Sequence, residues 1–187
     1  MDSRGHSCDM KPIRTHHDTS RPRAWLRYGA AATAVAATAV VGASAVEADS
    51  AWYRGLRKPD WQPPPWAFAA VWTPLYATIA YAAGHALGRA DNARRRCGLL
   101  GSLAVNLALN AEWNRLFFTL RSPGAGLAGT LLLDLSNADL LRRTARVDRT
   151  AARVLAPYAA WCCFATALNA SIARRNRRPK RIPPRRG

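Results

Sequence analysis

The chain has 187 residues, and its 28 Lys and Arg against 11 Asp and Glu give a formal net charge of +17. Such a charge is typical of nucleic-acid-binding proteins. Here, however, the basic residues gather at the ends of the chain and between nearly uncharged apolar runs, with eight Lys or Arg between Arg174 and Arg186. This distribution indicates a membrane protein and argues against a nucleic acid as the partner.

The N-terminal part combines a polar segment with an Ala-rich apolar run. Residues 1–24 are polar and lack periodicity, so we predict that they are disordered. Residues 29–46 are uncharged, which predicts a first membrane span at about 26–46. The alternative is a signal peptide, because the small residues at 42–45 would suit cleavage, although the run is long for that role.

The segment 52–76, WYRGLRKPDWQPPPWAFAAVWTPLY, contains four tryptophans, two tyrosines, one phenylalanine and five prolines. Prolines at 63–65 predict a stiff extended entrance to a second span at 66–88. Phe68, Trp72 and Tyr76 then share one stripe of that helix. The pattern favours an aromatic-walled site at a membrane surface; an interfacial aromatic belt with ordinary helix packing is the alternative.

A third span is predicted at 97–120, interrupted by Glu112 and Arg115. One face of this helix carries two amides, which need partners in apolar surroundings. We give equal weight to two interpretations of these amides, hydrogen bonds between helices and contacts with a ligand. The face consists of Asn106, Asn110, Trp113 and Phe117.

A fourth span is predicted at 124–146, with Asp134 near its middle. A carboxylate at the centre of a bilayer costs roughly 2.5–3.5 kcal/mol on insertion scales, so Asp134 should be paired, protonated or turned toward a polar cavity. Asn137, one turn away, is the expected hydrogen-bond partner.

The fifth span is predicted at 153–173 and is followed by a basic tail, 174–187. Its helical periodicity places aromatic and amide groups on one face, as on the second and third spans. Together these three faces could enclose a flat aromatic ligand. The face on the fifth span consists of Tyr158, Trp161, Ala165 and Asn169.

Three separated motifs resemble those of the TspO/MBR family, the tryptophan-rich sensory proteins. They are the segment 52–76, LNAEWNRLFF at 109–118 and APYAAWCCFATALN at 156–169. The resemblance covers about 52–176 and implies an all-α bundle of five transmembrane helices, in a bacterial cell membrane. It also implies a porphyrin-like ligand.

The resemblance further implies that Trp72, Asn106 and Trp161 line the ligand pocket and that the loop around Trp61, Pro63 and Pro64 is its lid. Ala165 matches a position whose side-chain size affects ligand binding. With the faces described above, the predicted ligand-binding residues are Tyr53, Trp61, Pro63, Pro64, Phe68, Trp72, Tyr76, Asn106, Asn110, Trp113, Asp134, Tyr158, Trp161, Ala165 and Asn169.

No cofactor is expected to be required. His85 is the only histidine in a predicted span and lies near its end, and the cysteines show no metal-ligand spacing, so we expect a porphyrin to bind without axial ligation of a metal. The expected partners are membrane lipids, porphyrin-like molecules and a second copy of the chain. Small residues at fourth-residue spacing, Gly98 with Ser102 and Ala104 with Ala108, would allow close approach of another helix.

Three classes of function remain open. The first is a membrane protein that senses, sequesters or transports tetrapyrroles. The second is an enzyme that degrades them with light and oxygen, for which Trp72 and Trp161 would be the participating residues, because no conventional catalytic constellation is visible. The third is a structural lipid-packing protein, which would explain the helices but neither the amides nor the prolines of the lid.

Overall fold

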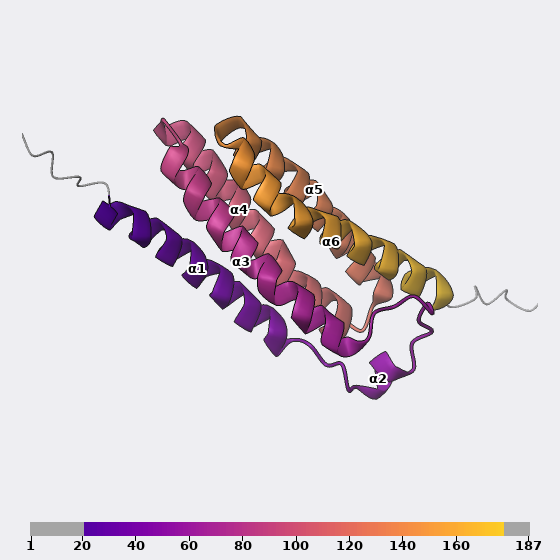
Figure 1. Ribbon diagram of the computed structural model, residues 1–187. Coiled ribbons are helices and arrows are strands. Elements are labelled where there is room, and N and C mark those ends of the chain that lie inside the picture. The colour runs from indigo at the N-terminus through magenta and orange to yellow at the C-terminus, as the bar shows by residue number, and fades with distance from the viewer. Residues whose placement is uncertain (1–20, 178–187) are drawn as a thin grey trace, which may run out of the picture.

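The computed structural model describes residues 21–177, and every regular element in that part of the chain is a helix. Five long helices lie side by side in one bundle, and a short helix lies in the loop at one end (Figure 1). The elements are α1 (Arg21–Ser44), α2 (Ala51–Arg54), α3 (Pro65–Arg89), α4 (Ala93–Asn114), η1 (Arg115–Thr119), α5 (Pro123–Val147) and α6 (Arg149–Arg175).

The first helix begins earlier than predicted. Residues 21–24, which we assigned to a disordered segment, form the start of α1. Pro22 occupies the first turn, where its fixed φ suits a helix and its missing N–H leaves no hydrogen bond unmade. The rest of the predicted disordered segment, 1–20, and the end of the basic tail, 178–187, lie outside the described residues.

Local sequence sets most helix starts. Pro65 and Pro123 are the first residues of α3 and α5, where proline is well tolerated. The side chains of Asn92, Ser122 and Asp148 accept hydrogen bonds from free N–H groups at the starts of α4, α5 and α6.

The third long helix changes its geometry before it ends. The α-helical hydrogen bonding of α4 stops at Asn114, and Arg115–Thr119 form a π-helical turn, η1. Turns of this kind are frequent at functional sites because they rotate side chains out of the α-helical register. In η1 both Phe117 and Phe118 are buried. Arg121, with a φ of 48°, reverses the chain before α5.

The core lies mainly between α3, α4, α5 and α6, around side chains such as Ile79, Leu103, Leu140 and Leu155. Helix α1 contributes little to this core and packs on α3 and α4. Gly84 permits part of that contact, since a Cβ at this position would meet the ring of Tyr28 at 2.4 Å. A second buried cluster surrounds Phe117 and Phe118 at the end of the bundle near α2.

Five membrane spans remain a prediction. Within the described residues, two helical segments are long and apolar enough to be candidate spans by length and composition alone, Ala24–Ser44 and Arg149–Arg175. Arginines at the start of α4 and two aspartates within α5 lower the hydropathy of those helices. Large apolar side chains nevertheless point outward from α4 and α5, as lipid-facing side chains would. They include Leu100, Val105, Leu131, Leu132 and Leu135.

Of the small residues predicted to allow close approach of another helix, Gly98 and Ser102 make contacts within the chain. Ser102 is buried and donates a hydrogen bond to Asp139 of α5 at 2.8 Å, and the Cα of Gly98 faces Arg143 of the same helix. The helix that approaches this pair is therefore α5 of the same chain, and the homodimer remains a prediction. Ala104 and Ala108 are exposed.

Candidate functional site

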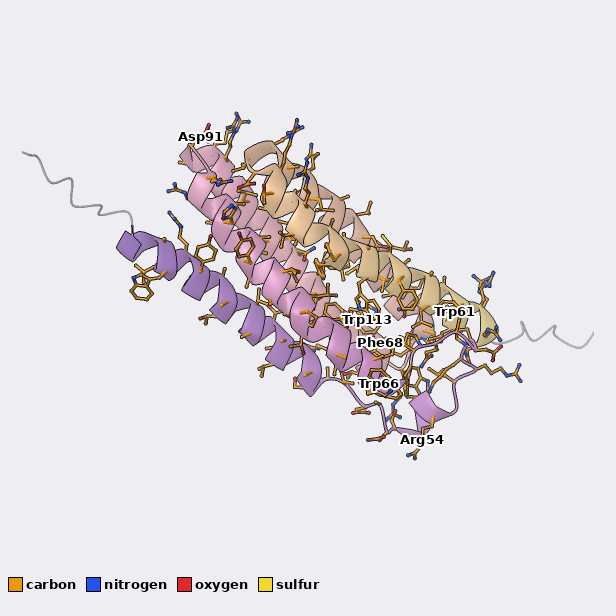
Figure 2. The ribbon with its side chains drawn as sticks, in the orientation of Figure 1. Arg54, Trp61, Trp66, Phe68, Asp91 and Trp113 are labelled. Atoms are coloured by element: carbon orange, nitrogen blue, oxygen red, sulfur yellow. The ribbon has the colours of Figure 1, made fainter. Side chains whose placement is uncertain are left out.

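A cavity of about 680 Å³ lies at the end of the bundle that carries α2. Side chains from all five long helices, from α2 and from η1 line it, and none of the described lining residues is charged. This volume is in the range of sites that hold cofactors and drug-sized ligands. Figure 2 shows Phe68 and Trp113, two of the lining residues, at this end of the bundle.

One wall is formed by aromatic rings of α3 and α6. Trp72 stacks on Tyr76 with ring centroids 5.2 Å apart, and Phe68 meets Trp161 edge-on at 6.1 Å. All four side chains line the cavity. Neither the Trp72 nor the Trp161 indole N–H has a hydrogen-bond partner among the described residues, so both donors are free for a ligand that carries acceptors.

A second aromatic wall comes from the end of α4 and from η1. Trp113 stacks on Phe117 at 5.5 Å and donates its indole N–H to the carbonyl of Gly126 at 3.1 Å. Gly126 is required for this packing, because a Cβ there would lie 2.6 Å from Cδ2 of Phe117. Phe118 completes the wall and contacts Tyr53 of α2, with centroids 5.4 Å apart.

A hydrogen-bonded chain of amides and phenols lies at the inner end of the cavity. Tyr76 donates to Asn110 Oδ1 at 3.2 Å, and Asn110 donates to the hydroxyl of Tyr158 at 3.2 Å. Tyr158 donates to Asn106 Oδ1 at 2.9 Å, and Asn106 donates to Asn137 Oδ1 at 2.7 Å. The chain joins α3, α4, α5 and α6, so it fixes the helices that form the cavity.

The loop between α1 and α3 covers the outer end. Tyr53 and Gln62 line the cavity, and Gln62 Nε2 donates to the Tyr53 hydroxyl at 3.2 Å. Lys58 Nζ lies 3.7 Å from the centroid of the Tyr53 ring. Burial raises the pKa of Tyr53, and the hydrogen bond from Gln62 opposes that shift; partial burial lowers the pKa of Lys58. The loop is thus held on the bundle by contacts that centre on Tyr53.

Nine of the fifteen predicted ligand-binding residues line the cavity. They come from α2, α3, α4 and α6, so residues far apart in the sequence meet in one place. The nine are Tyr53, Phe68, Trp72, Tyr76, Asn110, Trp113, Trp161, Ala165 and Asn169.

Two of the other predicted residues lie behind the cavity wall. Asn106 and Tyr158 are fully buried in the hydrogen-bonded chain and do not line the cavity. For Asn106 the structure shows contacts between helices, the alternative that we had weighed equally with a ligand contact. Both residues support the site without facing it.

Asp134 also lies outside the cavity lining. It accepts a hydrogen bond from Thr166 of α6 at 2.6 Å. Asn137, its predicted partner, instead accepts from Asn106, because the Asn137 side chain points to α4. The carboxylate therefore joins α5 to α6.

The prolines and tryptophan of the predicted lid do not reach the cavity. Trp61 is half exposed and packs edge-on against Phe164 of α6 at 5.8 Å. Pro63 and Pro64 lead into α3, and the neighbouring residues Gln62 and Pro65 line the cavity in their place. Gln62 was missed because an extended loop has no helical period that would indicate its inward face.

Sequence reasoning also missed lining residues on α1 and α5. Ala39 and Ala43 of α1, and Thr130 and Leu133 of α5, belong to helices for which we proposed no ligand contact apart from Asp134. Small and aliphatic residues are common on every face of these helices, so composition gave no signal for them. Cys162, for which we predicted no ligand contact, lines the cavity as well.

His85 lies away from the cavity. It contacts the Tyr28 hydroxyl at 3.0 Å and Asp148 at 3.2 Å, and Asp148 also pairs with Arg89. Within the described part of the chain, no three His, Cys, Asp or Glu residues are grouped so that they could hold a metal ion. Binding of a porphyrin without axial ligation remains a prediction.

Comparison with known proteins gives consistent matches. The model of the TspO/MBR family matches residues 30–175. The human translocator protein is 35% identical over 136 residues, which cover 71% of this chain and 80% of that protein. The tryptophan-rich protein TspO of Chlorobaculum tepidum is 35% identical over 125 residues (67% and 79%), and protein CrtK of Rhodobacter capsulatus is 34% identical over 141 residues (75% and 88%).

Proposed function

Because the chain belongs to the TspO/MBR family, we propose that it is an integral membrane protein that binds a porphyrin-like tetrapyrrole, as a sensor, a store or a transporter of that ligand. The observation that carries this proposal is the cavity of about 680 Å³ with aromatic rings from α3, α4, α6 and η1 in its lining. A flat aromatic macrocycle would gain stacking contacts with these rings.

The chemistry of the lining supports a large, mainly apolar ligand. Most of the lining surface is apolar, and the polar groups at the wall include the indole N–H groups of Trp72 and Trp161 and the amide of Asn110. Sites for small molecules commonly combine an apolar wall with a few such groups, which fix the orientation of the ligand. A purely structural lipid-packing role would leave this cavity without a purpose.

In this proposal the five long helices cross the membrane. The apolar residues on the outer faces of α4 and α5 then contact lipid, and the polar residues within those helices pair inside the bundle. Bacterial relatives of the chain are consistent with a bacterial cell membrane as its location. We also propose a homodimer, in which the exposed face of α4 around Ala104, Val105 and Ala108 meets its copy.

A titration of the detergent-purified protein with protoporphyrin, in the dark, tests the binding function. Porphyrin should quench tryptophan fluorescence, and Trp72→Leu should weaken binding several-fold, since one stacking face contributes about 0.5–1.5 kcal/mol. Trp66→Leu is the matched control, because Trp66 is 72% exposed and does not line the cavity. Equal affinities for the two variants, or no saturable quenching in the wild type, would contradict the proposal.

A second candidate function is degradation of the bound porphyrin by light and oxygen. The observation that favours it is the presence of two oxidisable indoles, Trp72 and Trp161, in the cavity wall. Phenylalanine keeps a stacking face but lacks the low oxidation potential of indole, so Trp72→Phe with Trp161→Phe should abolish bleaching and keep most of the binding. If the wild type bleaches porphyrin no faster than detergent alone does, the enzyme function fails and the binding function stands.

A further inference from the structure

We infer that Asn176 positions the lid of this cavity by pinning the loop 45–64 to the end of α6. Asn176 lies at the C-terminal cap of α6, outside the cavity. Its side-chain Oδ1 accepts a hydrogen bond from the backbone N–H of Arg57 at 3.0 Å. Its Nδ2 donates to the carbonyl of the same residue, also at 3.0 Å. One amide thus pairs with both backbone groups of a residue 119 positions earlier in the chain.

The amide is itself held in place at the bundle. Asn176 Nδ2 donates a further hydrogen bond to the carbonyl of Ile172 at 2.8 Å, and Ile172 lines the cavity. These hydrogen bonds of Asn176 connect the wall of the cavity to the loop, and we call them the pin. Figure 1 shows the loop with α2 reaching across to the end of α6.

Arg57 lies between Tyr53 and Gln62, two of the four residues of the loop 45–64 that line the cavity. Tyr53 precedes it by four positions and Gln62 follows it by five, and these two are hydrogen-bonded to each other at 3.2 Å. Lys58, next to the pinned residue, places its ammonium group over the Tyr53 ring. Fixing the backbone at Arg57 thus fixes the segment whose side chains close the outer end of the cavity.

The hydrogen bonds to Arg57 use both the donor and the acceptor of the Asn176 side-chain amide. Only a group that carries both a donor and an acceptor can bond the N–H and the C=O of one residue together. Leucine has a similar volume and neither function. The Arg57 side chain takes no part, because both bonds use its backbone, so Arg57→Ala retains the pin.

This inference rests on the proposed function, since a lid has meaning only if the cavity takes up a ligand. The porphyrin dissociation rate, measured by stopped flow in the dark, should rise about tenfold in Asn176→Leu, through the loss of two hydrogen bonds. It should stay unchanged in the matched control Arg57→Ala. If the rates of Asn176→Leu and the wild type agree, Asn176 does not position the lid.

Limited trypsin digestion without ligand gives an independent measurement. Arg54 and Arg57 are loop cleavage sites, and cleavage there should be faster in Asn176→Leu than in the wild type, as identified by fragment mass. A residue that only ends α6 would lower the thermal midpoint without speeding cleavage in the loop, and that result would overturn the inference. Absence of porphyrin binding in the wild type would remove the proposed function, while the digestion would still decide whether the pin exists.

A double variant keeps the test decisive if Asn176→Leu does not fold. Arg57→Cys with Asn176→Cys, in a background without the native cysteines, allows the loop to be locked and released in one protein. Oxidation should slow both porphyrin association and dissociation, and reduction should restore them. Equal rates in the oxidised and reduced forms, with the disulfide verified by mass, would contradict a lid at this position.

Discussion

Tyr158 of α6 donates its phenolic hydrogen to Asn106 Oδ1 of α4 at 2.9 Å, and the same hydroxyl accepts a hydrogen bond from Asn110. Both Tyr158 and Asn106 have an exposed fraction of 0%. Buried polar groups that lose a partner are costly, because no water replaces it. The hydroxyl therefore links Asn110, which lines the cavity, to Asn106, which donates to Asn137 of α5.

Removal of this hydroxyl should destabilise the bundle more than it weakens ligand binding. We expect Tyr158→Phe to lower the free energy of unfolding by about 1–3 kcal/mol, because it leaves Asn106 Oδ1 and Asn110 Nδ2 without their partner. Thermal unfolding in detergent measures the change. Tyr81→Phe is the matched control, since Tyr81 is 44% exposed. Equal stability of the two variants would show that the buried chain contributes little.

The close contact of Gly126 with Phe117 leads to a second prediction. A Cβ at Gly126 would lie 2.6 Å from the Phe117 ring, whereas a Cβ at Gly124 would meet nothing nearer than the Ser122 hydroxyl at 3.9 Å. We expect Gly126→Ala to displace the aromatic wall, with a loss of about 1–3 kcal/mol of stability. Porphyrin affinity should fall with it. Gly124→Ala, on the same helix, should leave both quantities unchanged, and similar behaviour of the two variants would contradict the packing described above.

Asp148 should make the opposite end of the bundle sensitive to acid. Burial alone would raise the pKa of this carboxyl, but hydrogen bonds from the Ala151 N–H, the Arg89 guanidinium and the Thr150 N–H lower it below its ordinary value of 3.8. A carboxyl with a lowered pKa in the folded state stabilises the fold above its unfolded pKa. That contribution is lost as the pH falls below about 4 toward the lower folded pKa.

Stability measured between pH 7 and pH 3 tests this dependence. At pH 7, Asp148→Asn should be less stable than the wild type by about 2 kcal/mol, because it loses charge-assisted hydrogen bonds. The difference between the two proteins should shrink as the pH falls. Asp60→Asn is the control, since Asp60 is exposed in the loop. A constant difference across the pH range would show that the Asp148 charge is not what stabilises this junction.

The arrangement of the chain ends predicts the membrane topology. Asn176 contacts Arg57, so the loop 45–64 and the end of α6 should lie on the same side of the membrane, whereas Asp91 lies at the opposite end of the bundle from Arg54 (Figure 2). In a background without native cysteines, Arg54→Cys and Arg177→Cys should react alike with an impermeant thiol reagent in intact cells. Asp91→Cys should behave oppositely. Equal labelling of all three sites would contradict five spans.

Helical periodicity predicted the part of the site that belongs to single helices. Phe68, Trp72 and Tyr76 recur every fourth residue, and all three line the cavity because they share one face of α3. Periodicity could not separate Asn110 from Asn106, which share a face of α4. Their different depths depend on Asn137 and Tyr158, which other helices supply. The position of Gln62 depends on the tertiary contacts of an extended loop, which leave no periodic pattern in the sequence.

The last prediction concerns how a metal-containing tetrapyrrole would be held. Cys162 lines the cavity and is therefore a possible axial ligand of a haem iron, as is Tyr76. The Tyr76 hydroxyl is engaged with Asn110 at 3.2 Å, and the lining residues carry no cation that would favour a thiolate at Cys162. We therefore expect stacking to hold the ligand.

Absorption spectra of the ferric haem complex measure this directly. The Soret band should keep its position in Cys162→Ala and in Tyr76→Phe, and metal-free and zinc porphyrins should bind with similar affinity. A Soret shift on loss of the Cys162 thiol would make Cys162 an axial ligand and would overturn the prediction that no metal ligation occurs.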